Sequence, residues 1–362
     1  MTDDLVERWA DLLTGYCLDV QPGELVLVGS ELAARPLVEA CYRSIVRRGA
    51  LPMVRVDLPG LHEYFLEHAP EAMLAKVPGS AFDEAKAVDA RIRISAESKT
   101  DGLGRIDPRR QALYDRARGP LRSASRHSRW VLTQFPTQAY ADDAEMPLDA
   151  YERYVASAMF LDQPDPAESW RALGRRQSGL VKALTGVSSM RIEAEGTDIT
   201  LSVAGRTWIN SDGKRNMPSG EIFTGPVEDS AEGRLRCGFP VCRDGRKLVG
   251  IELTFRRGLV VESKAEQGQD YLRSMIEMDP GACRLGELGL GLNGGINRFT
   301  GSILYDEKIG GTVHLALGQS YPETGGVNTS ALHWDLIVDT RRGGRVTADG
   351  RVVMEDGRWL VG

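Results

Sequence analysis

Residues 24–29 read Glu24-Leu25-Val26-Leu27-Val28-Gly29, a short apolar run that predicts a buried β-strand. Residues 51–57 read Leu51-Pro52-Met53-Val54-Arg55-Val56-Asp57 and predict a second strand. Between the two runs, apolar and small residues recur at helical spacing from Leu37 to Val46. A strand, a helix and a strand in this order form a βαβ unit, whose crossover leaves the two strands parallel in one sheet. This part of the chain therefore predicts an α/β fold.

The alternation of strands and helices continues through the first third of the chain. After an opening amphipathic helix, the expected elements are a strand over residues 89–95, a helix over 108–124 and a strand over 130–134. We therefore expect residues 1–140 to form an α/β N-terminal domain with a parallel sheet. Residues 140–146 are polar and typical of turns, and two amphipathic helices are expected over residues 148–161 and 166–184.

From Met190 onward the pattern changes to short strands separated by Gly, Asp and Pro turns. One helix is expected among them, near residues 269–278. Residues 141–362 therefore predict a larger α+β C-terminal domain. A chain of 362 residues is long enough for two domains, because single hydrophobic cores stop growing at roughly 250–300 residues.

Composition and charge exclude several classes of partner. The formal net charge of −6 argues against nucleic acid, whose binders present a basic face. No apolar run approaches the roughly 20 residues that cross a bilayer, and the acidic start is unlike a signal peptide. Five scattered cysteines without C-x-x-C spacing fit a reducing compartment. We expect a cytoplasmic protein with no membrane segment.

Candidate metal ligands gather in the C-terminal half, which is rich in glycine. His333 and Asp335 are two residues apart in a predicted strand, so their side chains point to the same face. His314 lies in another predicted strand, and it needs a neighbouring strand to come close to His333. Glu221 and Glu287 each follow a glycine, which lets backbone and ion approach closely. Two imidazoles and carboxylates suit zinc, cobalt, manganese or iron.

One competing motif is a dinucleotide-binding pattern. Residues 289–294, Gly289-Leu290-Gly291-Leu292-Asn293-Gly294, satisfy G-x-G-x-x-G. Such a fingerprint must open a helix whose N-terminus receives pyrophosphate. Residues 295–298 continue as a turn in the sequence pattern, so we reject the dinucleotide interpretation.

Four segments together resemble the metallo-aminopeptidases of the aminopeptidase T and aminopeptidase S group, the thermophilic metallopeptidases. They are Asn216-Met217-Pro218-Ser219-Gly220-Glu221, Gly281-Ala282-Cys283-Arg284-Leu285-Gly286-Glu287, Gly311-Thr312-Val313-His314-Leu315-Ala316-Leu317-Gly318 and Asn328-Thr329-Ser330-Ala331-Leu332-His333-Trp334-Asp335. The similarity also includes residues 21–28, so it covers nearly the whole chain.

The resemblance implies an activity, a cofactor and a set of residue roles. It implies a metal-dependent aminopeptidase with peptide substrates, a homodimer, and two divalent ions, zinc or cobalt before manganese or magnesium. The implied metal ligands are Glu221, Glu287, His314, His333 and Asp335. Tyr321 matches the active-site tyrosine of the family, and we place Glu287 beside it among the catalytic residues. Which carboxylate acts as the general base stays open.

Two alternatives stay open beside the peptidase. Some relatives of this fold resemble hydroxypyridine dioxygenases, and two histidines with one carboxylate suit ferrous iron. An iron-dependent ring-opening dioxygenase is therefore the rival enzyme, although Glu221 and Glu287 together exceed the acids that a single iron needs. The other alternative is a non-catalytic relative that binds metal without turnover.

Overall fold

The computed structural model describes residues 1–100, 102–243 and 245–362. The chain divides into two compact units, Met1–Ala167 with Gly213–Pro218 and Glu168–Asp212 with Ser219–Gly362. We expected a division at residue 140, whereas the helix α9 (Leu148–Ala158) lies in the first unit. The division into separate domains stays a prediction.

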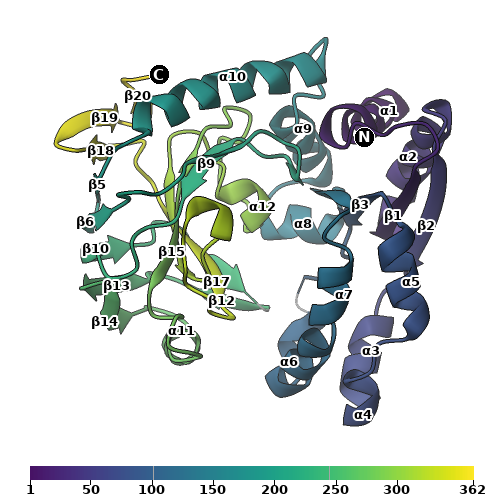
Figure 1. Ribbon diagram of the computed structural model, residues 1–362, viewed down its shortest axis with the longest axis horizontal. Coiled ribbons are helices and arrows are strands. Elements are labelled where there is room, and N and C mark those ends of the chain that lie inside the picture. The colour runs from purple at the N-terminus through teal and green to yellow at the C-terminus, as the bar shows by residue number, and fades with distance from the viewer. Residues whose placement is uncertain (101, 244) are drawn as a thin grey trace. The chain divides into compact units, whose positions relative to one another are not determined.

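The first unit contains a parallel sheet with the strand order β2-β1-β3-β4-β8. Its strands β1, β2 and β3 are labelled in Figure 1. Its strands are β1 (Leu25–Glu31), β2 (Leu51–Asp57), β3 (Ala90–Ser95), β4 (Arg129–Gln134) and β8 (Asn216–Met217). All four pairings are parallel, which confirms the expected parallel sheet. Val26 and Val28 in β1 are completely buried, as expected for a strand that helices cover on both faces.

Helices connect the strands of this sheet along the chain of the first unit. They are α1 (Asp3–Asp11) with the π-helical turn Leu12–Cys17, α2 (Arg35–Arg47), α3 (Leu61–His68), α4 (Glu71–Leu74), α5 (Gly79–Ala87), α6 (Pro108–Ala117), α7 (Gly119–Ala124), α8 (Gln138–Asp143) and α9, with short 3-10 turns at Leu32–Ala34 and Gly102–Arg105. The helices α3, α4 and α5 were not predicted.

Two predictions of local structure in this unit were wrong. The helix expected over residues 108–124 is two helices, because Pro120 has no N–H to continue the hydrogen-bond ladder of α6 and instead lies in the first turn of α7. The segment expected as a turn near residue 140 contains α8. Its start is stabilised by the Thr137 hydroxyl, which accepts a hydrogen bond from the N–H of Tyr140 at 3.3 Å.

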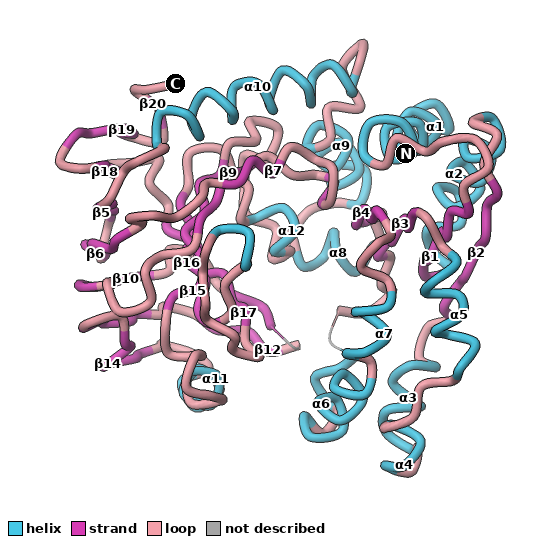
Figure 2. Tube along the Cα trace, in the orientation of Figure 1, coloured by secondary structure: helices cyan, strands magenta, loops and turns pink. Residues whose placement is uncertain are grey.

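Two antiparallel sheets form most of the second unit (Figure 2). The larger has the order β14-β13-β10-β6-β5-β18-β19-β20, and the smaller, which we call the site sheet, has the order β17-β16-β15-β9-β7. A separate hairpin pairs β11 with β12. Mixed α/β architecture with one parallel and several antiparallel sheets therefore agrees with the expected fold class.

The elements of the second unit are mostly short strands. They are α10 (Pro166–Leu184), β5 (Ser189–Ala194), β6 (Thr197–Ser202), β7 (Ile209–Ser211), β9 (Glu221–Thr224), β10 (Glu232–Arg236), β11 (Val241–Arg243), β12 (Arg246–Leu248), β13 (Glu252–Arg256), β14 (Leu259–Lys264), α11 (Gln269–Ile276), β15 (Leu285–Gly291), α12 (Ile303–Asp306), β16 (Val313–Gly318), the 3-10 turn Pro322–Thr324, β17 (His333–Val338), β18 (Arg345–Ala348), β19 (Arg351–Glu355) and β20 (Arg358–Trp359).

One hydrophobic cluster joins the two antiparallel sheets. It combines residues such as Ile192 and Leu253 from the larger sheet with Leu288, Leu315 and Leu336 from the site sheet. Each such side chain stabilises the fold by about 1.5–3 kcal/mol when fully buried. One face of the site sheet is therefore fixed by core packing, which leaves the other face to carry polar groups.

Within the described part of the chain, no helix is both long and apolar enough to cross a membrane.

Candidate metal centre

Antiparallel register brings the predicted ligands onto one face of the site sheet. In β16 and β17, Ala316 lies opposite Asp335, and Gly318 lies opposite His333. Side chains alternate between the faces of a strand, so residues two apart share a face. The core face of β15, β16 and β17 carries leucines, and the opposite face carries the charged ligands. A one-residue slip of β17 would send its ligands into the core, so the packing of the core fixes the position of the ligands.

Glycines make room for the ligands on that face. Gly289 lies opposite His314, and a Cβ at Gly289 would stand 1.9 Å from the imidazole Nε2. A Cβ at Gly286 would stand 2.2 Å from the carbonyl oxygen of Gly318. Gly220 has φ +108°, in the left-handed region, and a Cβ added there would stand 2.8 Å from the Cβ of Asn293. The glycines beside Glu221 and Glu287 are therefore required by the close approach of other parts of the chain, and the expected approach of an ion to them stays a prediction.

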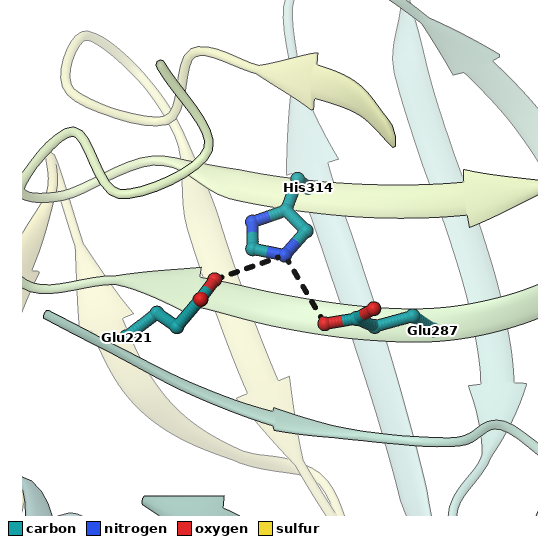
Figure 3. Close-up of side chains that lie close together, drawn as sticks. All are labelled: Glu221, Glu287 and His314. Carbon is teal, nitrogen blue, oxygen red and sulfur yellow. Dashed lines mark ion pairs between the residues drawn. The ribbon is translucent and has the colours of Figure 1, made fainter. Parts of the chain in front are cut away.

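The first of two donor groups consists of Glu221, Glu287 and His314 (Figure 3). The Nε2 of His314 lies 3.4 Å from Oε2 of Glu221 and 3.5 Å from Oε1 of Glu287. All three side chains are buried, and their ligand atoms lie within 4.8 Å of one another.

The second donor group consists of Glu287, His333 and Asp335. The Nε2 of His333 lies 3.3 Å from Oε2 of Glu287 and 3.6 Å from Oδ1 of Asp335. His333 is oriented by its other nitrogen, since Nδ1 lies 2.9 Å from the carbonyl oxygen of Gln319. With its N–H on Nδ1, the ring presents Nε2 as a free ligand atom. Glu287 belongs to both groups, one oxygen facing each histidine.

A buried lysine stands behind the first group. Lys308 has no exposed surface, and its Nζ forms an ion pair with Glu307 and lies 3.6 Å from Oε1 of Glu221. A buried ammonium is costly unless it is paired, so these two carboxylates hold it in place. The neighbouring carboxylates raise its pKa against the opposing effect of burial, and Lys308 is therefore charged.

The donor set fits divalent cations. The Oε2 of Glu221 and the Oδ1 of Asp335 are buried without a hydrogen-bond donor, although buried polar atoms are normally satisfied. Three carboxylates converge with two imidazole nitrogens, and both residue types are ordinary ligands of zinc and other divalent ions. A cation bound between these oxygens and the imidazole nitrogens would give each buried oxygen the partner that it lacks.

Burial and neighbouring charge perturb the pKa of every member of the cluster. Burial raises the pKa of Glu221 and of Asp335, and the nearby cations only partly offset this. Burial has the same tendency at Glu287, but the imidazoles of His314 and His333, which face its two oxygens, outweigh it and lower the pKa of that carboxyl. Burial opposes charge on both imidazoles, yet the carboxylates raise the pKa of each histidine to about 10. Binding of a cation therefore competes with protons at this site.

Tyr321 lies beside the second donor group. Its ring centroid is 5.3 Å from the ring of His333 and 5.3 Å from the ring of Phe223, and the residue is 40% exposed. Burial of the hydroxyl and the carboxylates around it raise the pKa of Tyr321, so the phenol keeps its proton and is able to donate a hydrogen bond. The structure thus brings all six predicted site residues to one region.

Sequence reasoning missed the residues that support the ligands. Lys308 was overlooked because a lone lysine near a turn normally lies on the surface. Gln177 in α10 was also missed, and its side-chain amide donates to the backbone oxygens of Glu221 and Ser211. No local sequence pattern marks Lys308 or Gln177 as part of the site. Only their contacts with Glu221 in the folded chain show that they support it.

The family of the chain follows from comparison with known proteins. Residues 2–359 match the model of the family described as thermophilic metalloprotease (M29). The chain belongs to this family. Curated relatives include Aminopeptidase 2 of Geobacillus stearothermophilus, 29% identical over 98% of this chain and 97% of the relative. Aminopeptidase T of Thermus thermophilus is 28% identical over 98% of both chains.

Solved structures give the same relationship. Wild-type AmpT from Thermus thermophilus superposes with a TM-score of 0.84 at 26% identity, covering 99% of both chains. The 2,5-dihydroxypyridine dioxygenase from Pseudomonas putida KT2440 superposes with a TM-score of 0.64 at 16% identity, covering 99% of this chain and 98% of the other. The second likeness concerns the fold alone.

Membership of the M29 family makes the chain a hydrolase of the metallopeptidase type, as the sequence predicted. A metallopeptidase requires a divalent metal, and the two donor groups are residues that can bind one.

Proposed function

We propose that this protein is an aminopeptidase that removes N-terminal residues from peptides with the help of two divalent cations, zinc or cobalt before manganese or magnesium. The observation that carries the proposal is the position of Glu287, whose two carboxylate oxygens lie 3.5 Å from His314 and 3.3 Å from His333. A carboxylate shared by two donor groups suits a pair of ions about 3.5–4 Å apart. The named relatives are aminopeptidases, which supports the same activity.

Each cation has its own ligands in this proposal. Glu221 and His314 would hold one ion, His333 and Asp335 would hold the other, and Glu287 lies where it could contribute to both. When bound, such ions would lower the pKa of a water molecule from about 16 to about 7 and polarise the scissile carbonyl. The two ions would also leave a position for the free amine of the substrate, which would limit cleavage to the N-terminal residue.

Tyr321 has a separate role in this proposal. Its protonated hydroxyl donates a hydrogen bond to the carbonyl oxygen of the scissile peptide, and the bond strengthens as the oxygen becomes an oxyanion. A single such donor is worth about 2.7–4 kcal/mol in mutational studies. Glu287 contributes by holding both ions, and its shared position makes it the residue on which both halves of the site depend.

A dioxygenase is the second candidate, on the strength of its shared fold. Two histidines and one carboxylate suffice for ferrous iron, and His314, His333 and Glu287 supply that set. Glu221 and Asp335 are then superfluous. Metal analysis separates the two, because the peptidase binds two ions per chain and the dioxygenase binds one iron.

The direct test uses purified protein treated with EDTA and the chromogenic substrate leucine p-nitroanilide. We expect no release of p-nitroaniline from stripped protein and restored release on adding Co²⁺ or Zn²⁺. A protein that binds two ions per chain and still releases nothing from any aminoacyl substrate is a non-catalytic relative, contrary to the proposal. The cytoplasmic location and the homodimer stay predictions, and size-exclusion chromatography with light scattering tests the dimer.

A further inference from the structure

Two of the four segments that carry the resemblance are joined to each other at their starts. One begins at Gly281 and ends at Glu287, and the other begins at Asn328 and ends at Asp335. The side-chain amide of Asn328 donates a hydrogen bond to the carbonyl oxygen of Gly281 at 2.9 Å. A Cβ at Gly281 would stand 2.2 Å from Oδ1 of Asn328, so a larger residue there would displace the amide. The contact lies outside the ligand set, and ligation alone does not explain it.

Asp279 joins the same two segments through both of its carboxylate oxygens. Oδ1 accepts from the N–H groups of Gly281 and Ala282, at 2.9 and 3.0 Å. Oδ2 accepts from the hydroxyl of Ser330 and from the N–H of Ala331, at 2.9 and 2.8 Å. Burial opposes the charge of the carboxylate, but these hydrogen bonds outweigh burial and lower the pKa of Asp279. Hydrogen bonds to a charged acceptor are roughly twice as strong as neutral ones, so Asp279 holds the two segments firmly together.

The loop clamp, which we define as Asp279 and Asn328, lies in the loops before two ligands that the site sheet fixes only in part. The pairing of β15 with β16 is irregular immediately before Glu287, and His333 is the first residue of β17. An irregular pairing disrupts the ladder of hydrogen bonds, and a strand end has few of them. The two ligands nevertheless face each other closely, with Oε2 of Glu287 3.3 Å from Nε2 of His333. Their separation therefore depends on the loops that lead into β15 and β17.

The loop clamp also contacts the segment of Tyr321. The carbonyl oxygen of Asn328 accepts a hydrogen bond at 3.0 Å from the N–H of Ser320, the residue before Tyr321. Gln319, one residue earlier, presents its carbonyl oxygen to Nδ1 of His333 at 2.9 Å. One set of contacts therefore holds the imidazole, the carbonyl that orients it and the tyrosine beside the second donor group.

We propose that the loop clamp positions His333 against Glu287 and so sets the affinity of the second donor group for its cation. The inference rests on the proposed function, which places a second divalent ion there. Asp279 and Asn328 act in this role without touching the ion, through the backbone that leads to the ligands. Breaking the clamp releases the loop before His333 and widens the gap between the two ligands.

The first donor group does not depend on the loop clamp. Beyond Glu287, β15 pairs with β9 on one side and with β16 on the other. This two-sided pairing keeps Glu287 in place relative to His314. Glu221 is held from other parts of the chain, by Gln177 in α10 and by the ammonium of Lys308. Loss of the clamp should therefore weaken the binding of one ion and spare the other.

Zinc titration of Asp279→Asn tests the inference. The asparagine keeps one acceptor oxygen but presents an amide NH2 in place of the other, so one segment loses its acceptor. Metal-free protein is titrated with Zn²⁺ in competition with a chromophoric chelator, which yields a dissociation constant for each ion. We expect one constant to rise at least about 10-fold and the other to change less than about 3-fold, since supports of metal ligands are worth about 10- to 100-fold in affinity. Equal losses at both ions would show that the clamp stabilises the fold as a whole, contrary to the inference.

Asp335→Asn identifies the weakened ion, because Asp335 belongs to the second donor group alone. This variant should lack the constant that Asp279→Asn weakens. Adding Asp279→Asn to it should leave the remaining constant within about 3-fold of its value, because the supports of the first group are intact. A loss of about 10-fold or more in the double variant would place the effect of the clamp at the first group and refute the assignment.

The matched control is Asp349→Asn. Asp349 also accepts hydrogen bonds from backbone N–H groups, those of Ser188 and Ser189 at 3.2 and 2.8 Å, but it ties the turn between β18 and β19 to the start of β5. We expect this variant to lower the midpoint of urea unfolding and to leave both zinc constants unchanged. A rise equal to that in Asp279→Asn would reveal a general effect of lost stability. Asn328→Ala breaks the other half of the clamp and should weaken the same ion, which keeps the test decisive if Asp279→Asn does not fold.

The zinc titration also separates this inference from the proposed function, because it requires no turnover. If Asp279→Asn weakens the second ion alone, in a protein that hydrolyses no aminoacyl substrate, the loop clamp stands and the aminopeptidase proposal fails. If the wild type hydrolyses leucine p-nitroanilide and the clamp variants keep both zinc constants, the aminopeptidase proposal stands and the role of the clamp fails. A wild type that binds fewer than two zinc ions overturns the inference, since no second ion is then there to be positioned.

Discussion

The two donor groups share Glu287 but differ in what surrounds them. The group of Glu221 and His314 is buried on all sides and has the ammonium of Lys308 behind it. In the group of His333 and Asp335, the imidazole side chain is 25% exposed, Tyr321 lies against the ring and a small apolar pocket begins at Asp335. The first group is therefore suited to holding an ion permanently, and the second to meeting substrate.

The difference also concerns charge. The first group contains a fixed cation that neutralises part of its carboxylate charge, whereas the second has another buried acid nearby, Asp306. Removing a side chain from the first donor group should consequently affect stability and metal content. Removing a side chain from the second donor group should affect turnover. The predictions below test this division.

The largest effect is expected at Glu287, where the two groups meet. Glu287→Gln replaces the shared carboxylate with a neutral amide, and we expect kcat/KM to fall by at least about 10⁴-fold, because both ions lose a ligand in one substitution. Elemental analysis should find fewer than two metals per chain. Glu262→Gln on the exposed strand β14 is the control. Retention of two ions with full activity would show that the groups do not depend on Glu287.

Lys308 tests the first group alone. Lys308→Met leaves the carboxylates of Glu221 and Glu307 without their cation, and breaking a buried pair in this way costs about 3–5 kcal/mol. Urea denaturation of EDTA-treated protein should show that loss of unfolding free energy. With saturating metal the loss should be smaller, because an ion at Glu221 supplies positive charge.

The matched control for Lys308 is Lys264→Met, since Lys264 is exposed at the end of β14. An equal loss with and without metal would mean that Lys308 stabilises the fold without acting on the first group. A loss confined to the metal-loaded protein contradicts the charge argument altogether.

The sequence predicted which residues gather in the two donor groups better than it predicted their surroundings, and the reason is physical. His333 and Asp335 are two apart in a strand, so alternation alone puts them on one face. The proximity of His314 to them depends on the antiparallel pairing of β16 with β17, and that of Glu221 on β9 pairing with β15. The ligand set came from resemblance to a family, and these pairings were not predicted, because strand order is decided by core packing that no local pattern specifies.

Local structure shows the same limit. The strands β1 and β2 were predicted from apolar runs, and their parallel pairing follows from the crossover. The break between α6 and α7 at Pro120 and the start of α8 at Thr137 each depend on a single residue. The prediction followed the apolar and polar pattern of the longer segments and therefore missed both. Lys308 is the clearest case, since its burial results from Glu221, a residue far away in the sequence.

Tyr321 tests the second group. Tyr321→Phe keeps the ring against His333 and removes the hydroxyl, and we expect kcat to fall about 10²-fold with little change in KM or in metal content. Steady-state kinetics with leucine p-nitroanilide and elemental analysis measure the three quantities. A variant that loses metal, or one in which only KM rises, indicates that the tyrosine positions His333 or binds substrate and does not stabilise the oxyanion.

The smallest effect is expected at Asp306, the acid beside the second group. Burial raises its pKa to about 7, against hydrogen bonds from Thr300, so the folded protein retains a proton that the unfolded chain releases near its ordinary value of 3.8. The contribution of this residue to stability is therefore complete below about pH 4 and is lost as pH rises through about 7. Asp306→Asn keeps the oxygen that accepts from Thr300 but cannot ionise.

The variant should consequently be more stable than the wild type at pH 8, by roughly 1 kcal/mol or more, and no more stable at pH 4. Urea denaturation of both proteins at the two pH values measures the difference, in which the titrations of all other groups largely cancel. A difference that is the same at both pH values would place Asp306 in an environment that does not oppose its charge. The second group would then face a fixed anion across the pocket, and the contrast with Lys308 behind the first group would become sharper, because each ion would have a permanent charge of opposite sign beside it.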